Sequence, residues 1–213
     1  MTKKALIMAG GTGGHVFPGL AVAQELIDRG FSVDWLGTTA GIESRLVVDA
    51  GLPLHVIPVR GVRGKGVLTK VKAPINVILS VLSAIKIVNK IKPNVVLGFG
   101  GFVSGPGGVA AKVLGIPLVI HEQNAVAGST NKLLSKIARK VFSAFPCGLI
   151  KEQCVGNPVR RELESVSQPS ERFSQRSHGV NVLVIGGSRG AQAINELVPQ
   201  ALANIEYSGV LNI

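Results

Sequence analysis

Stretches with the apolar spacing of a strand alternate with stretches that have the spacing of a helix along the first 121 residues. A strand, a helix and a second strand form a parallel pair with a right-handed crossover. Repetition of this unit predicts an α/β fold, in which helices cover both faces of a parallel sheet. The expected strands are 4–9, 31–36, 54–58, 94–98, 117–121 and 140–142, and the expected helices are 17–29, 41–50, 76–91, 106–114 and 129–138.

The alternation breaks around 156–160, and the next residues are polar and rich in Ser, Arg and Glu. This change is typical of a connection between domains. We therefore interpret residues 1–155 as a complete Rossmann-like domain and residues 156–179 as the interdomain connection.

A further strand is expected at 180–185, followed by a second glycine loop and an apolar-periodic helix that ends at Ala203. One such fragment cannot bury both faces of a sheet. We interpret residues 180–213 as the start of a second Rossmann-like domain that is only partly present, and expect the chain to be a fragment of a longer protein.

The glycine-rich segment Gly10–His15 joins the first expected strand to the first expected helix. Its four glycines allow a tight turn with outward N–H groups, and the following helix adds free amides and the positive end of its dipole. The segment predicts a site for a phosphate or diphosphate. The alternative is a turn that only joins strand to helix.

The same segment differs from two well-known nucleotide loops. Val16 occupies the position of the third glycine in the dinucleotide fingerprint, and no acidic residue closes the second expected strand. The chain also contains no Walker sequence. A Rossmann-type oxidoreductase is therefore a disfavoured alternative.

Two more polar or glycine-rich segments, Gly98–Phe102 and His121–Asn124, follow expected strands. The carboxyl ends of parallel strands share one edge, where ligands bind. We expect these segments to converge with Gly10–His15, and Gly186–Ala191 to face them across a cleft from the second domain.

The formal net charge of +11 is unevenly distributed. No acidic residue lies between Asp49 and Glu122, so one face is expected to be strongly basic. Nucleic acid is a disfavoured partner, because the basic region lacks interleaved aromatic residues and a nucleic-acid-binding module. The basic residues of this interval are Arg60, Arg63, Lys65, Lys70, Lys72, Lys86, Lys90, Lys92 and Lys112.

The apolar stretch from Ala73 to Ile91 is interrupted by polar residues and is shorter than the roughly 20 residues that span a bilayer. We expect an amphipathic helix that packs on the sheet through Ile78, Leu82 and Ile85, while another part rests on an anionic membrane surface. The chain opens without a secretory signal pattern, which favours a cytoplasmic protein.

The ordered motifs closely resemble those of the MurG family of bacterial glycosyltransferases. The resemblance implies a GT-B fold, with an acceptor domain before a UDP-sugar domain. It also implies inverting transfer of GlcNAc from UDP-GlcNAc to undecaprenyl-pyrophosphoryl-MurNAc-pentapeptide (lipid I), giving lipid II in peptidoglycan synthesis. The motifs are Gly10–Pro18, Arg63–Gly66, Gly100–Phe102, His121–Asn124, Gly156–Arg160 and Gly186–Ser188.

The resemblance also implies roles for individual residues. His15 is the candidate base for the acceptor hydroxyl, and Glu122 is the carboxylate that orients His15 or shares this role. No cofactor or metal is implied, and the protein is expected at the cytoplasmic face of the plasma membrane. The implied substrate-binding residues are Thr12, Gly13, Gly14, Gly100, Gly101, Asn124, Arg160 and Ser188.

Other interpretations of these residues remain open. His15 could cap the helix or be exposed, and Glu122 could be a strand-end carboxylate bonded to backbone amides. The chain ends at Ile213, before the family's uracil, ribose and sugar contacts, so we expect no transfer by these residues alone. The leading alternative function is a non-catalytic fragment that docks on the membrane and binds acceptor.

Overall fold

The computed structural model describes residues 2–58, 67–174, 176, 179–186 and 191–212, with only the backbone for 67–73. The chain divides into two compact units, residues 1–164 and residues 165–213, and each is described by itself.

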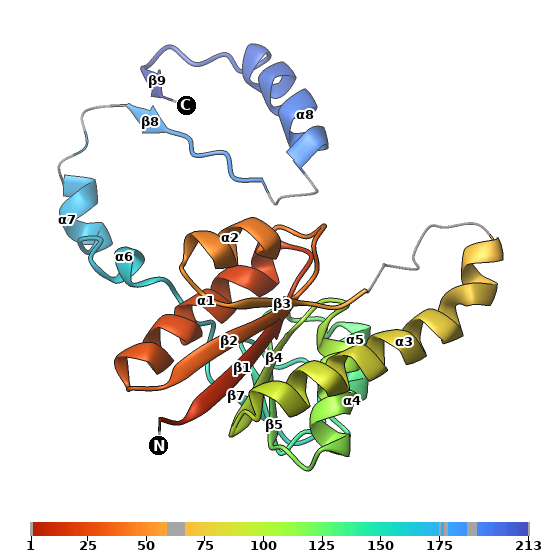
Figure 1. Cartoon of the computed structure of the whole chain (residues 1–213). Coiled ribbons are helices and arrows are strands. Elements are labelled where there is room, and N and C mark those ends of the chain that lie inside the picture. Colours follow the sequence, from red (N-terminus) through yellow and green to blue (C-terminus); the bar gives the residue numbers. More distant parts are fainter. Residues whose placement is uncertain (1, 59–66, 175, 177–178, 187–190, 213) are drawn as a thin grey trace. The chain divides into compact units, whose positions relative to one another are not determined.

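The first unit is built on a seven-stranded sheet in which every neighbouring pair is parallel (Figure 1). The order β3-β2-β1-β4-β5-β6-β7 places β1 and β4 side by side at the centre, where the direction of winding reverses. The predicted α/β fold with a parallel sheet is confirmed. The strands are β1 Lys4–Ala9, β2 Ser32–Gly37, β3 Leu54–Val56, β4 Val95–Gly100, β5 Leu118–Glu122, β6 Lys140–Ser143 and β7 Glu152–Cys154.

Helices cover both faces of this sheet (Figure 1). In one core, Trp35 of β2 packs with Val16 of α1 and Val47 of α2. In the other, Met8 of β1 packs with Val88 of α3, Ala110 of α4 and Leu134 of α5. The helices are α1 Gly13–Asp28, α2 Glu43–Asp49, α3 Val67–Ile91, α4 Ser104–Val113, α5 Ser129–Leu134 and α6 Arg161–Glu164.

Helix α3 differs from the expectation in its length and in its packing face. It packs through Ser80, Ala84 and Val88, while Ile78 and Leu82 are 59% and 51% exposed. The prediction that Ile78 and Leu82 pack on the sheet was wrong, because the small residues Ser80 and Ala84 allow closer approach. The 18 residues Pro74–Ile91 are, by length and composition, long and apolar enough to cross a membrane.

Strand β7 was not expected from the sequence, because its three residues carry no clear apolar alternation. The carboxylate of Glu152 accepts hydrogen bonds from the N–H groups of Cys147, Gly148 and Leu149. These bonds fold the preceding loop and lower the pKa of Glu152 to about 2, with the Ser143 hydroxyl as the largest cause. The hydrogen bond from the Ser143 hydroxyl of β6, together with these loop bonds, thus positions this edge strand.

The second unit has little interior, since none of its described residues is buried. Its strand pairing covers only two residues on each side, fewer than the strand expected from 180–185. The apolar-periodic helix that was expected to end at Ala203 is present. The elements are α7 Pro169–Ser174, β8 Val180–Asn181, α8 Ala191–Ala203 and β9 Leu211–Asn212.

Candidate functional site

The carboxyl ends of β1 and β4 meet at the edge where the sequence predicted a site. The hydroxyl of Ser104 in α4 lies 3.0 Å from the Met8 carbonyl oxygen and 2.8 Å from that of Gly100. It also accepts a hydrogen bond from the Gly100 N–H at 3.1 Å. This buried hydroxyl therefore fixes the ends of the two central strands against each other.

The two glycines at the end of β4 are required by close approach and by backbone angle. Gly100 and Gly101 have φ values of 105° and 82°, which side chains rarely adopt. A Cβ on Gly101 would overlap the Gly10 carbonyl oxygen, and a Cβ on Gly100 would lie 2.9 Å from the His15 ring. The predicted convergence of the segments after β1 and β4 is confirmed.

A buried carboxylate that sequence reasoning missed lies beneath the glycine loop. Glu43 is fully buried and accepts hydrogen bonds from the Gly11 N–H at 3.0 Å, the Thr38 N–H at 3.0 Å and the Thr38 hydroxyl at 2.7 Å. It ties the loop after β1 to the loop after β2. The sequence showed Glu43 only as an acidic residue in the first turn of an expected helix. Such a position does not indicate that a side chain is buried.

The pattern of backbone hydrogen bonds limits which loop amides are open to a ligand. The Gly11 N–H is bonded to Glu43, and the N–H groups of His15 and Val16 are bonded to the Thr12 carbonyl oxygen. Within the described residues, the N–H groups of Thr12, Gly13 and Gly14 have no protein acceptor. These three amides at the start of α1 form the open part of the predicted anion site.

His15 lies in the first turn of α1 with its ring against the backbone of Gly100. Its Nδ1 atom lies 3.3 Å from the Thr12 hydroxyl, and its Nε2 atom has no hydrogen-bond partner in the described part of the chain. The imidazole is half-buried. Thr12 therefore contacts one ring nitrogen, and the other has no described hydrogen bond.

Glu122 ends β5 and is 1% exposed. Its carboxylate accepts hydrogen bonds from the N–H groups of Asn124 and Gly128, both at 3.0 Å, and from the side-chain amides of Asn124 and Asn131, both at 2.9 Å. Burial raises the pKa of Glu122, but these hydrogen bonds outweigh burial and hold it below the usual range. The carboxylate thus organises the loop that carries Asn124.

His121 fixes the segment that leaves β7. Its Nε2–H donates to the Gly156 carbonyl oxygen at 2.9 Å, and its Nδ1 atom lies 3.2 Å from the Gln123 side-chain nitrogen. Because a carbonyl oxygen only accepts, Nε2 carries the proton. Burial lowers the pKa of His121 despite the opposing effects of Gly156 and Glu122. The ring therefore acts as a neutral structural group at neutral pH.

A pocket of about 460 Å³ joins the segments after β1, β5 and β7. We call it the glycine-loop pocket. The guanidinium carbon of Arg160 lies 4.9 Å from the centroid of the Phe17 ring, so a cation lies in the same pocket as Gly13 and Gly14. The lining includes Gly13, Gly14, Phe17, Asn124, Asn157 and Arg160.

The predicted site residues are not all part of this arrangement. Gly13, Gly14, Asn124 and Arg160 line the glycine-loop pocket. His15 contacts Thr12 and the backbone of Gly100, and these residues, like Gly101, are not among those that line the pocket. Ser188 and the segment 63–66 lie outside the described residues. No group of three metal-ligating side chains occurs among the described residues.

Comparisons with known proteins show which family this chain is similar to. Residues 5–143 match the N-terminal domain of glycosyltransferase family 28. The chain is 50% identical over 204 residues to the UDP-N-acetylglucosamine–N-acetylmuramyl-(pentapeptide) pyrophosphoryl-undecaprenol N-acetylglucosamine transferase of Haemophilus ducreyi. It is 52% identical over 203 residues to the protein with the same name in Histophilus somni.

These matches cover most of this chain and a smaller part of each relative. They include 94% and 95% of the chain, but 58% and 57% of the two relatives. The crystal structure of Acinetobacter baumannii MurG is similar with a TM-score of 0.79 and 45% identity, over 96% of this chain and 58% of that one. The chain thus spans a little over half the length of these relatives.

Proposed function

The chain belongs to glycosyltransferase family 28, and from this membership we propose that it takes part in the transfer of GlcNAc from UDP-GlcNAc to lipid I. The reaction would form lipid II for peptidoglycan. The relatives' names describe such a transferase. The observation that carries the proposal is the set of open amides at Thr12, Gly13 and Gly14 beside the open Nε2 atom of His15.

His15 acts as the general base in this proposal. Its Nδ1–H donates to the Thr12 hydroxyl, which leaves the lone pair of Nε2 for the acceptor sugar hydroxyl. The hydroxyl oxygen then attacks the anomeric carbon of GlcNAc from the face opposite UDP. The bond from that carbon to the diphosphate breaks, the configuration inverts, and His15 holds the proton.

Amide N–H groups and a cation stabilise the phosphates in the same proposal. The open amides of α1 suit a diphosphate, and Arg160 adds a positive charge across the glycine-loop pocket. Glu122 is a positioning residue here, because its described hydrogen bonds all go to the loop from Asn124 to Asn131. It places Asn124 at the pocket and takes no proton.

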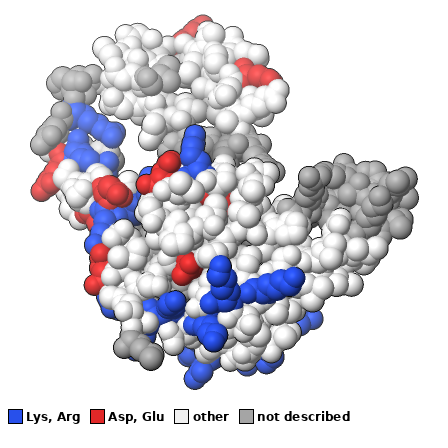
Figure 2. All heavy atoms as spheres, viewed as in Figure 1, with Lys and Arg blue, Asp and Glu red and all other residues white. Residues whose placement is uncertain are grey.

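A membrane surface is the proposed location of the acceptor. Ile75, Val77, Ile78, Leu79 and Leu82 of α3 are each more than half exposed. Farther along, Lys86, Lys90 and Lys92 are exposed, and Figure 2 shows basic side chains gathered around this end of the helix. An apolar stretch next to cations suits binding at the cytoplasmic face of an anionic bilayer. Ser80, Ala84 and Val88 keep the helix packed on the unit, which favours lying on the bilayer over crossing it.

Binding of the chain to neutral vesicles that contain lipid I tests the acceptor site directly. We expect sedimentation with these vesicles and much weaker sedimentation with vesicles that contain undecaprenyl phosphate. Gly14→Val should abolish the difference in sedimentation between the two kinds of vesicle, because the added methyl groups would occupy the ligand's space. The fold should tolerate the change, since Gly14 is exposed and the nearest atom to a new Cβ is 3.8 Å away. Equal binding to both vesicles, or full binding by Gly14→Val, would contradict the proposal.

Turnover tests the role of His15 in a chain of the relatives' full length. His15→Ala should lower GlcNAc transfer by roughly 10²- to 10⁴-fold, the usual contribution of a general base, with little change in donor affinity. Thr12→Val should lower transfer less than His15→Ala does. Thr12→Ser should keep transfer near the wild-type rate, because the hydroxyl is the group that orients the His15 ring. A loss of only a few-fold in His15→Ala would exclude His15 as the base.

A further inference from the structure

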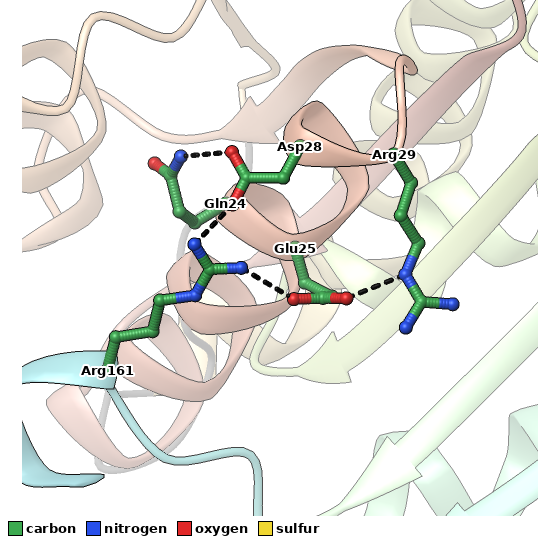
Figure 3. A network of polar contacts seen from close by, with 5 residues as sticks. All are labelled: Gln24, Glu25, Asp28, Arg29 and Arg161. Atoms are coloured by element: carbon green, nitrogen blue, oxygen red, sulfur yellow. Dashed lines mark hydrogen bonds and ion pairs between the residues drawn. The ribbon is translucent and has the colours of Figure 1, made fainter.

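Arg161, the residue after Arg160, makes two ion pairs with helix α1 (Figure 3). One guanidinium nitrogen lies 2.8 Å from a carboxylate oxygen of Glu25, and another contacts Asp28. Arg29, which follows the last residue of α1, donates to the other oxygen of Glu25 at 2.6 Å, and Gln24 of α1 donates to Asp28 at 3.0 Å. Both acceptors of Arg161 are therefore also held by neighbouring side chains.

The same helix also carries the contact of Arg160. Phe17, which lies beneath the Arg160 guanidinium, is three turns before Asp28 on one side of α1. Arg160 and Arg161 thus rest on α1 at two points along its length. The first point is in the glycine-loop pocket, and the second is away from the open amides of Gly13 and Gly14.

We propose that Arg161 is a positioning residue that holds the segment 158–162 against α1, so that the Arg160 guanidinium stays at the glycine-loop pocket to bind a diphosphate. This inference rests on the proposed function. Arg161 is unsuited to bind the anion itself, because Glu25 and Asp28 balance its charge and would repel a phosphate. The three side chains are 56%, 46% and 36% exposed, so the effect should be modest and weaken with salt.

Calorimetric titration of the chain with inorganic pyrophosphate at low salt tests the effect on binding. We expect Arg161→Gln to weaken binding roughly three- to tenfold, the range for two exposed ion pairs. Arg29→Gln is the matched control: it removes the same charge and a partner of the same Glu25, but it lies outside the 158–162 segment. It should leave the affinity nearly unchanged.

A double-mutant cycle separates positioning from direct attraction. Arg160→Gln should weaken binding more than Arg161→Gln, and adding Arg161→Gln to Arg160→Gln should cause no further loss. A further loss equal to that in the wild-type background would show that Arg161 attracts the anion directly. That result would overturn the positioning role.

Amide hydrogen exchange across residues 158–164 tests the ion pairs without a ligand. Exchange should be faster in Arg161→Gln and in Glu25→Gln/Asp28→Asn, and unchanged in Arg29→Gln. Unchanged exchange in the first two variants would overturn the proposal, whatever the binding result. Faster exchange with no binding of pyrophosphate by the wild-type chain would overturn the anion site of the proposed function, and the positioning role with it.

Discussion

At the scale of single residues, the site depends on glycines and on buried carboxylates, and only the glycines could be recognised from the sequence. Glycines mark where the backbone approaches itself, as Gly101 does beside Gly10. Buried carboxylates hold the loops, as Glu43 and Glu122 do through backbone N–H groups. A glycine-rich loop can be recognised in the sequence. The role of a carboxylate can be recognised only from its burial and its hydrogen-bond partners in the fold.

Gly101→Ala should destabilise the first unit more than Gly51→Ala. Both glycines have positive φ, with values of 82° and 71°, so each substitution costs about 1 to 2 kcal/mol of backbone strain. Only at Gly101 does the new Cβ meet backbone, whereas at Gly51 nothing lies within 4 Å. Urea unfolding measures the free energy of unfolding of both variants. Fluorescence of Trp35, the single tryptophan, reports on the first unit. Equal losses in the two variants would contradict the close approach of Gly101 to Gly10.

Glu122→Gln should lower the free energy of unfolding by about 2 kcal/mol at neutral pH, because a buried, charge-assisted set of hydrogen bonds is lost. The pKa of Glu122 is lower in the folded state than its unfolded value of about 4.3. Its stabilisation is therefore complete above that value and is lost as the pH falls through the folded pKa.

The stability difference between wild type and Glu122→Gln should accordingly shrink as the pH falls below about 4.3. Urea unfolding at several pH values, followed by Trp35 fluorescence, measures this. Glu164→Gln, at an exposed position of the same unit, is the control and should show little difference at any pH. A difference that grows in acid would mean that the folded pKa of Glu122 is raised.

At the scale of elements, helix α3 shows how one apolar stretch serves two environments. Ser80, Ala84 and Val88, spaced four residues apart, form its packed face. Large apolar residues such as Ile78 and Leu82 remain exposed. Residue size explains this division, because small side chains let the helix approach its neighbours and large ones cover another surface.

Replacing Lys86, Lys90 and Lys92 together with Gln should weaken binding to anionic phosphatidylglycerol vesicles. Each exposed cation near such a surface contributes about 1 kcal/mol, so the loss should be on the order of a hundredfold and should shrink as salt rises. Arg29→Gln/Arg45→Gln/Arg172→Gln removes the same charge elsewhere and should bind nearly as wild type. Equal losses of vesicle binding in both triple variants would mean that only the net charge of the protein matters, and not the position of these lysines.

At the scale of the whole molecule, the two units differ in how much interior they have. The first contains two apolar cores on either side of its sheet, whereas no described residue of the second is buried. The first unit also includes residues 156–164, which the sequence analysis had placed in the connection. Contacts of Gly156 with His121 and of Arg161 with α1 hold them there.

Removal of residues 165–213 should leave the unfolding midpoint of the first unit unchanged when Trp35 fluorescence is followed. Removal of residues 156–213 should lower its stability by about 1 to 2 kcal/mol, because the buried His121 N–H loses its acceptor at Gly156. The pair of truncations therefore locates the end of the first unit. A large loss in the shorter deletion would contradict the division at residue 164.

The sequence by itself determined the parallel α/β sheet, and it predicts a phosphate site at the glycine loop Gly10–His15. Strand and helix periodicities and glycine spacing are local properties, so they are readable without the fold. The likeness to Acinetobacter baumannii MurG, with a TM-score of 0.79, confirms the predicted GT-B type of fold.

Only the tertiary structure decided which polar groups became partners. It buried Glu43 under the glycine loop, directed Glu122 to the loop of Asn124, and brought Arg161 to Glu25 across 136 positions of sequence. The contacts of Glu43 with Gly11 and of Arg161 with Glu25 join elements that are distant in sequence, whereas Glu122 bonds to the loop that directly follows it. Their strength depends on burial and distance, which no local pattern of residues records.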